Sequence, residues 1–338
     1  MTMRKSAVIR AIRAAIAFVI AANLLYVIPF AVPGYLVSQF ATVLALGVAV
    51  LGLNLVTGYG GAITLGHGAF MALGAYTTAI LTVRHGWNPF ATIPVAAVLA
   101  FCGGLALGIP ALRLQGLYLA LCTLVLSITI PPLLKRMDTL TGGVQGLFLG
   151  NPPAPAWLPI DDSQWIYFVV LAIAVVAYGI AHRIVASPLG RALLAVRDNP
   201  LVGAVMGVSR FRLSTTTFAI SSLFAGVAGS LYAMIVGFVS PDTFTVMLSL
   251  SLFIAAVVGG VTSLPGAFFG AAFIQFAPVW ASDIDVALAG LVYGGALVVV
   301  LLLLPDGIGG AVSRILQRST RRASPSIEES PLARSQDA

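Results

Sequence analysis

Residues 36–57 read LVSQFATVLALGVAVLGLNLVT, an unbroken apolar stretch with no charged side chain. A helix of about 20 such residues spans the hydrocarbon core of a bilayer. The whole chain continues this pattern: 59% of its 338 residues are apolar and 9% are charged, against roughly 25% charged in a soluble domain. The mean hydropathy is +1.03. So few charges cannot form a soluble surface, and the sequence therefore predicts an all-α integral membrane protein.

Proline, glycine and charged clusters divide the rest of the chain into further apolar runs of similar length. The first run follows several basic residues, but its apolar part of about 19 residues is long for a signal peptide, and more runs follow it, so we expect an uncleaved first span. Together the runs predict about ten transmembrane helices, at residues 10–32, 36–57, 66–83, 90–110, 115–134, 164–183, 213–237, 246–262, 264–281 and 286–304.

The distribution of lysine and arginine predicts the orientation of these spans, because basic residues collect on the cytoplasmic side. With ten crossings and the N-terminus inside, Arg84, Lys135 and Arg136 fall outside, and the other 15 of the 18 basic residues fall inside. We therefore expect a multi-pass membrane protein with both termini in the cytoplasm. The net charge of +7 then lies mainly on the cytoplasmic side, where basic residues can bind anionic lipid headgroups. No nucleic-acid partner is expected.

The expected organisation is a transmembrane domain over residues 1–316 and a disordered cytoplasmic tail over 317–338, which is rich in Arg and Ser. Two longer segments connect the spans: an irregular outer loop at 135–163 and an inner segment at 184–212. The four spans after the first enter from outside and the four after the sixth enter from inside. This alternation is compatible with an inverted repeat of two four-helix units, as in many transporters.

The chemistry of an enzyme is missing from the sequence. No G-x-x-x-x-G-K-[ST] motif occurs, so the chain has no P-loop for ATP. Glutamate is confined to the tail, and no predicted span carries an acidic residue at its middle. His67, His85 and His182 lie on three different segments, and Cys102 and Cys122 lie in apolar runs without metal-site spacing. We expect no catalytic residue, no metal and no cofactor, and any ATP hydrolysis must come from another polypeptide.

The run GYGGAITLGHGAF at residues 58–70 interrupts the apolar pattern with five glycines in the eleven residues 58–68. One interpretation is a short cytoplasmic loop followed by a helix face that packs closely. The other is a helix break, re-entrant or not, that shapes a solute path, because unwound backbone in a membrane must lie against protein or water. In that case four polar side chains are candidates for the path: Asn54, Thr64, His67 and Ser222.

The inner segment 184–212 contains the pattern of a short capped helix. Asp198 or Asn199 can cap it, Pro200 fits its first turn, and Gly207 fits beyond its end. Apolar side chains including Leu201 and Val205 would otherwise be exposed, so we expect this helix to dock against a partner. The alternative is an interfacial helix that rests on the membrane or on its own bundle.

Several blocks in the order expected resemble the branched-chain amino-acid ABC importer permeases of the LivM type. They include TGGVQG at 141–146, SPDTF at 240–244 and GGVTSLPG at 259–266, and lie within residues 52–76, 112–120, 140–147, 187–207, 240–244 and 258–266. The resemblance implies a permease subunit that moves branched-chain or related amino acids inward by alternating access. It also implies a second permease of the LivH type, two cytoplasmic ATPases and a periplasmic binding protein as partners.

By the same resemblance, the segment at 201–207 stands where ABC importers carry their ATPase-docking loop, with Leu201, Val202 and Gly203 in place of its usual Glu-Ala-Ala. The implied coupling residues are Arg197, Asp198, Pro200, Leu201, Val205 and Gly207. A stand-alone secondary transporter or channel for a small polar solute remains the alternative. The solute is also open, since related permeases are associated with urea, amides, aromatic amino acids and other carboxylates, and the two permeases could be identical or different.

Overall fold

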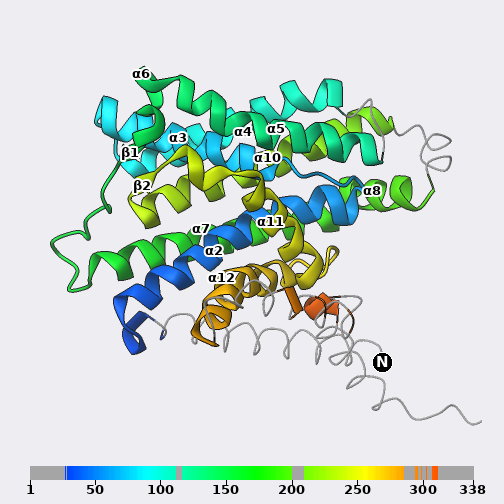
Figure 1. Cartoon of the computed structure of the whole chain (residues 1–338). Helices are drawn as coiled ribbons and strands as arrows, with labels where there is room; N and C mark the ends of the chain where they lie inside the picture. The colour runs from blue at the N-terminus through cyan, green and yellow to red at the C-terminus, as the bar shows by residue number, and fades with distance from the viewer. Residues whose placement is uncertain are drawn as a thin grey trace, which may run out of the picture.

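A computed structural model describes residues 27, 29–111, 116–199, 209–284, 294–295, 298, 302 and 307–310, and this part of the chain is almost entirely helical (Figure 1). Five of its helices are long and apolar enough to cross a membrane. This confirms an all-α membrane protein. The principal helices of the described residues are α2 (Gly34–Asn54), α3 (His67–His85), α4 (Pro89–Ala111), α5 (Leu117–Arg136), α7 (Asp162–Ala186), α10 (Arg210–Val236), α11 (Val246–Gly259) and α12 (Gly266–Ile284).

These helices lie on eight of the predicted spans, from the one at 36–57 to the one at 264–281, with boundaries that differ by a few residues. The predicted first span, 10–32, and the predicted last span, 286–304, lie largely outside the described residues. The tail at 317–338 lies wholly outside them. The total of ten crossings and the inverted repeat therefore stay predictions.

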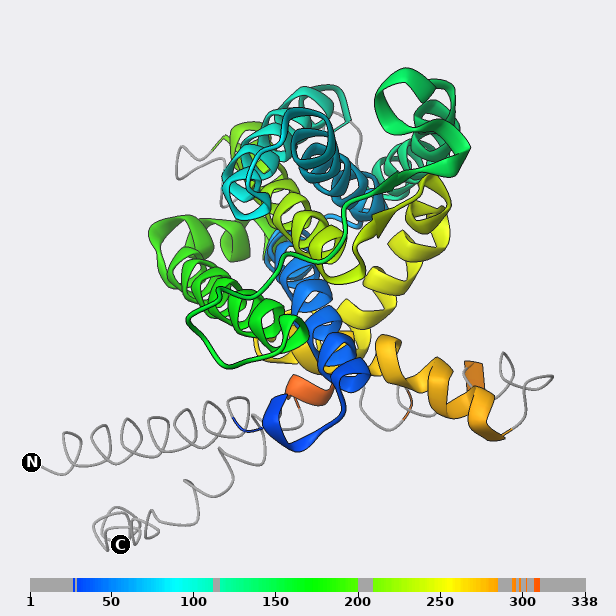
Figure 2. The same ribbon diagram turned by 90° about the vertical axis from the view of Figure 1, so that its left-hand side faces the viewer.

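Helices α2 and α10 form the centre of the bundle. The most apolar 18 residues of each helix show this. They are 89% buried in α2 and 78% buried in α10, but only 22–28% buried in α4, α5 and α7. Helix α10 packs against α2, α3 and α4, and α2 packs against α7 and α12. Figure 2 shows α2 surrounded by the other helices. The peripheral helices leave apolar side chains on the outside, where a bilayer would cover them.

Small residues allow α3 and α10 to approach closely. A Cβ added to Gly74 of α3 would lie 1.9 Å from the Gly226 carbonyl oxygen of α10, and one added to Gly229 would lie 2.0 Å from the Met71 oxygen. In a membrane such close backbone contact drives helix association, because lipid provides no hydrophobic force between helices. The α3–α10 contact thus depends on glycine at these positions.

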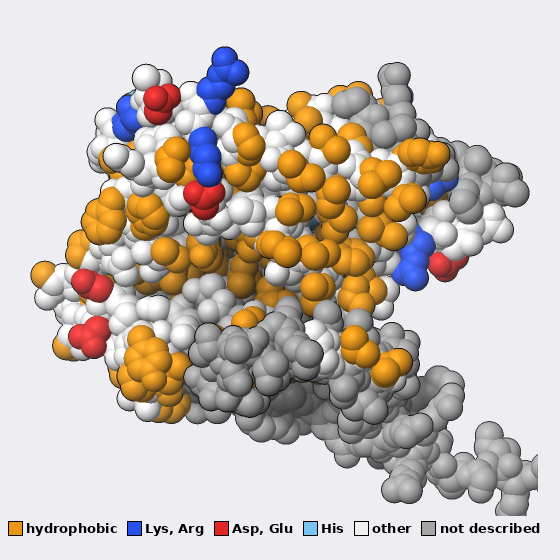
Figure 3. Space-filling view, in the orientation of Figure 1, with side chains coloured by type: hydrophobic (Ala, Val, Ile, Leu, Met, Phe, Trp, Pro, Cys, Tyr) orange, Lys and Arg blue, Asp and Glu red, His pale blue; other side chains and the backbone are white. Residues whose placement is uncertain are grey.

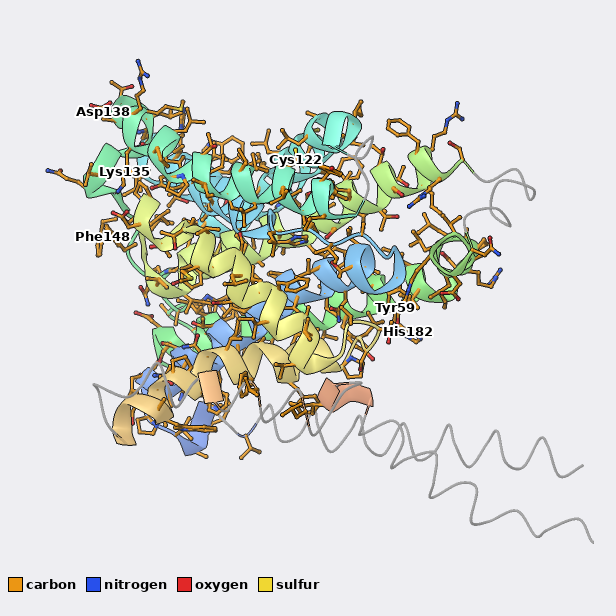
Figure 4. The ribbon with its side chains drawn as sticks, turned by 45° about the vertical axis from the view of Figure 1, so that its right-hand side comes forward. Tyr59, Cys122, Lys135, Asp138, Phe148 and His182 are labelled. Atoms are coloured by element: carbon orange, nitrogen blue, oxygen red, sulfur yellow. The ribbon has the colours of Figure 1, made fainter. Side chains whose placement is uncertain are left out.

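Charged side chains lie at the two ends of the bundle, with an apolar belt between them (Figure 3). One end, here called the β1 end, carries Lys135, Arg136 and acidic residues such as Asp138 and Asp242. The opposite end, here called the α8 end, carries five arginines at the ends of α7, α8 and α10. Lys135 and Asp138 mark the β1 end in Figure 4, and Tyr59 and His182 mark the α8 end.

The outer segment 135–163 is more ordered than the irregular loop that the sequence predicts. Helix α5 continues to Arg136, and α6 (Asp138–Thr141), the 3₁₀ turn η2 (Gly143–Gln145) and strand β1 (Leu147–Phe148) follow. Strand β1 pairs antiparallel with β2 (Phe238–Val239), and the 3₁₀ turn η3 (Pro241–Phe244) follows β2. Lys135 Nζ lies 2.6 Å from Asp242 Oδ1 and joins α5 to η3. The pairing was not predictable locally, because the two strands are about 90 residues apart.

The inner segment begins with helix α8 (Pro188–Asp198), which the ten predicted spans do not include. Ser187 caps it by accepting a hydrogen bond from the Leu189 amide, and Pro188 occupies its first turn, a favoured position because proline lacks the amide hydrogen. Asp198 ends this helix, and Asn199 has an extended backbone. Of the two caps considered for the following helix, Asp198 is therefore part of α8. Pro200, Leu201, Val205 and Gly207 lie outside the described residues.

Candidate functional site

The most irregular backbone inside the bundle lies between α2 and α3. Helix α2 runs into a π-helical turn, η1 (Leu55–Tyr59), and residues 61–66 then form neither helix nor strand. Single π-helical turns are rare in proteins, but those that occur often lie at functional sites. Gly61 has φ +68°, and a Cβ on Gly58 would lie 1.8 Å from the Val261 carbonyl oxygen. Glycine therefore permits both the turn and its close contact, and residues 55–66 are called the helix break below.

The loop between α11 and α12 holds one side of the helix break. Tyr59 Oη donates a 2.7 Å hydrogen bond to the Thr262 carbonyl. Asn54, a predicted path residue, donates from Nδ2 to the Ser263 carbonyl at 3.1 Å. Asn54 is buried and faces this loop. Its amide group therefore joins α2 to the second half of the chain.

Hydroxyl groups on α5 bind the backbone on the other side of the break. The Leu65 amide donates to Thr123 Oγ1 at 3.0 Å, and the Leu65 carbonyl accepts from Ser127 Oγ at 2.6 Å. An unwound backbone in a membrane needs such partners, since each unsatisfied polar group costs several kcal/mol in lipid. Thr123 and Ser127 are four residues apart and share one helix face, so both reach the same residue.

A third hydroxyl extends this network to α11. Ser249 Oγ accepts from the Gly68 amide at 2.9 Å and lies 2.9 Å from Ser127 Oγ. Because Ser127 gives its single proton to the Leu65 carbonyl, Ser249 must be the donor between the two serines. The hydrogen bonds thus run in one direction, from the Gly68 amide through Ser249 and Ser127 to the Leu65 carbonyl. Three helices are joined at this point.

His67 opens α3 and is 1% exposed. Its Nε2 lies 2.7 Å from Ser221 Oγ, and Ser221 donates to the Gly52 carbonyl at 2.6 Å. Ser221 lies about 16 Å along α10, a helix roughly 40 Å long, at 1.5 Å per residue. The pair therefore lies in the interior of the bundle, and it joins α3 and α10 to α2.

Of the four predicted path residues, the structure places Thr64 in the break, Asn54 directly before it and His67 directly after it, and only Ser222 lies elsewhere. Ser222 donates to the Phe218 carbonyl of its own helix and lies against Gly104 of α4. Sequence analysis missed Ser221, the residue that binds His67. It also missed the hydroxyls that hold the break, which belong to Thr123, Ser127 and Ser249. Thr123 and Ser127 lie four residues apart on α5, and that spacing was a usable signal.

Arg197 connects α8 to the helix break. Its Nη1 donates to the Gly58 carbonyl in η1, and a Cβ on Gly61 would lie 2.9 Å from Arg197 Cγ. Arg197 Nε also lies 3.9 Å from Asp198 Oδ1, and both side chains are partly exposed, at 39% and 75%. The arginine therefore contacts the break between its glycines.

Replacing Ser127 with alanine should lower the stability of the bundle. The Leu65 carbonyl would lose its donor and the Ser249 hydroxyl would lose the acceptor for its proton, which costs about 1–3 kcal/mol when the groups stay buried. Thermal unfolding of the purified protein in detergent measures the change. Thr129→Ala on the same helix is the matched control, because Thr129 is exposed and bonds only to the Val125 carbonyl of its own helix. Equal unfolding temperatures for the two variants would contradict the proposed network.

Fold and site together define a multi-pass helical membrane protein with an interrupted helix at its centre. Among the described residues no group of three or more His, Cys, Asp or Glu side chains could hold a metal ion. The chain belongs to the family described as branched-chain amino acid transport system / permease component, whose model matches residues 35–301. The match includes α2, the helix break and every later helix described above.

Individual relatives agree with the family. The high-affinity branched-chain amino acid transport system permease protein LivM of Escherichia coli is 32% identical over 283 residues, which cover 76% of this chain and 66% of LivM, just under two thirds. Its counterpart LivH from the same bacterium is 27% identical over 77% of this chain and 89% of LivH. BraD of Pseudomonas aeruginosa is 30% identical over 52% of this chain and 56% of BraD. No solved structure matches the chain significantly.

Proposed function

We propose that this chain is the membrane-spanning subunit of an ATP-driven importer that moves branched-chain amino acids or related small solutes into the cell by alternating access. The observation that carries the proposal is the family match over residues 35–301, with LivM, LivH and BraD as relatives. The chain has no P-loop, so the energy must come from separate ATPases. A second permease of the LivH type and a periplasmic binding protein complete the proposed assembly.

The proposed orientation has the α8 end in the cytoplasm. The arginines of α7, α8 and α10 support it, because basic residues are retained on the cytoplasmic side. Both termini would then be cytoplasmic in a ten-span subunit of the bacterial inner membrane, with residues 1–316 as the permease domain. Modification of single introduced cysteines in intact cells tests this: one at Arg191 should be protected from a membrane-impermeant reagent, and one at Asp161 should react.

Coupling would begin next to α8. In the proposed assembly an ATPase docks at the segment 198–207. The docking residues there are Asp198, Pro200, Leu201, Val205 and Gly207. Movement there displaces α8, and Arg197 passes the displacement to Gly58 in the break. The break connects α2 to α3, and α3 packs against α10, so a small movement of η1 can separate α3 from α10. Two states of a packed interface are the general basis of such transitions.

Uptake of labelled leucine into proteoliposomes that contain this chain with its companion permease, ATPases and binding protein tests the function. We expect uptake when ATP is supplied on the side of the membrane that carries the ATPases. A non-hydrolysable ATP analogue should give no uptake. Removing the ATPases should abolish uptake, whereas collapse of ion gradients should leave it intact. Gradient-driven uptake by this chain alone would overturn the proposal and favour a secondary transporter.

A further inference from the structure

The protonation of His67 follows from its neighbours. Ser221 has one hydroxyl proton, and it donates that proton to the Gly52 carbonyl, which can only accept. His67 Nε2 must therefore be the donor in the 2.7 Å hydrogen bond to Ser221. In the neutral imidazole the other nitrogen, Nδ1, then carries a lone pair and acts as an acceptor.

This acceptor has no hydrogen-bond partner among the described residues, although the side chain is 1% exposed. Burying such a group without a partner is unfavourable, so the open acceptor calls for an explanation. The surrounding hydroxyls are already committed: Ser221 to Gly52, and Ser249 and Ser127 to the chain that ends on Leu65. Among these groups, His67 Nδ1 is the acceptor left without a partner, and its chemistry calls for an N–H or O–H donor.

His67 is also the first residue of α3, a 19-residue helix. The N-terminal end of a helix carries a partial positive charge that favours anions. His67 therefore combines two features. Its Nδ1 can accept a hydrogen bond from an ammonium group, and the partial positive charge of the α3 N-terminus can attract a carboxylate. This combination is complementary to a zwitterion, and it needs no charged side chain inside the membrane.

We infer that His67 binds the α-ammonium group of the transported amino acid through Nδ1, with the carboxylate at the N-terminal end of α3. The inference rests on the proposed function and adds to it the place and the chemical group of recognition. The ring is enclosed in this conformation, so binding requires α3 to move away from α10. That movement breaks the hydrogen bond of His67 to Ser221 of α10 and separates the packed glycine faces of α3 and α10.

Two substitutions distinguish binding from a structural role. The amide nitrogen of glutamine reaches the position of histidine Nε2, so His67→Gln keeps a donor for Ser221 and removes the acceptor at Nδ1. Ser221→Ala is the converse variant, because it removes the tie to α10 and keeps the imidazole. A purely structural His67 predicts that Ser221→Ala is the more damaging change for every ligand.

Binding of labelled leucine to the purified complex, without nucleotide or binding protein, gives the measurement. Unlabelled leucine and 4-methylpentanoate, which is leucine without its amino group, serve as competitors. In the unmodified complex leucine should compete at least about tenfold better, an affinity difference of about 1.4 kcal/mol. In His67→Gln the ratio should fall to about one, whereas Ser221→Ala should keep it while lowering the unfolding temperature.

An unchanged ratio in His67→Gln would overturn the inference, and so would a complex that binds no leucine by itself. Both outcomes are separable from failure of the proposed function, because ATP-driven uptake by the whole assembly is measured independently. A His67→Gln complex that transports leucine with unchanged KM would also count against the site. Circular dichroism and gel filtration of each variant confirm that the bundle remains folded.

Discussion

Arg197→Ala should reduce leucine uptake by at least about tenfold while the assembled complex continues to hydrolyse ATP. The arginine donates to the Gly58 carbonyl, and a hydrogen bond from a charged group contributes about 1.5–3 kcal/mol. Because 39% of the Arg197 side chain is exposed, the lower end of that range applies, and about 1.4 kcal/mol corresponds to tenfold. In the proposed coupling route, movement of α8 would then no longer displace η1.

Arg191→Ala is the matched control for this prediction. Arg191 lies on the same helix and is exposed, but its Nη1 donates to the Ala186 carbonyl at the end of α7 instead of to the break. Uptake and ATP hydrolysis, measured side by side in proteoliposomes, should both stay near normal in this variant. Equal loss of uptake in the two variants would show that α8 acts only through its overall charge.

Gly74→Ala should prevent α3 and α10 from packing, with a loss of more than about 3 kcal/mol of stability, at the upper limit for overpacked sites. The added Cβ would lie 1.9 Å from the Gly226 carbonyl oxygen, and 2.6 Å from its carbon. Both are backbone atoms of the central helix, so no side chain can move aside. The yield of monodisperse protein after detergent extraction and its thermal unfolding should both fall sharply.

Gly179→Ala provides the control within the same protein. Gly179 lies in α7, and a Cβ there meets nothing within 4 Å. Alanine also has the higher helix propensity by about 1 kcal/mol, so this variant should be as stable as the original or slightly more so. If Gly74→Ala unfolds at the same temperature as Gly179→Ala, the close contact of α3 with α10 does not exist in the membrane.

The positions of the spans could be predicted from the sequence because they depend on local composition. An apolar run of about 20 residues excludes water wherever it lies in the chain, and the ends of α7 and α10 fall within a few residues of the predicted ones. The glycines at 58–68 likewise marked an irregular backbone before its form was known. In each case the signal is contained within one continuous segment.

The contacts of the site could not be predicted in this way. His67 and Ser221 are 154 residues apart, and Arg197 and Gly58 are 139 apart. Neighbouring serines on α10 have the same local signal, so sequence analysis chose Ser222 where Ser221 faces His67. One position along a helix turns a side chain by about 100°, and only the packing of α10 against α2, α3 and α4 fixes which serine faces the break.

The sequence by itself therefore determined the solvent, the helices and the absence of an ATP-binding motif, because these follow from which residues neighbour one another along the chain. Only the tertiary structure decided which hydroxyls satisfy the unwound backbone and which arginine contacts it. Those choices depend on how closely glycine faces such as Gly74 and Gly226 let two helices approach, and that distance is a property of the packed bundle and of no single segment.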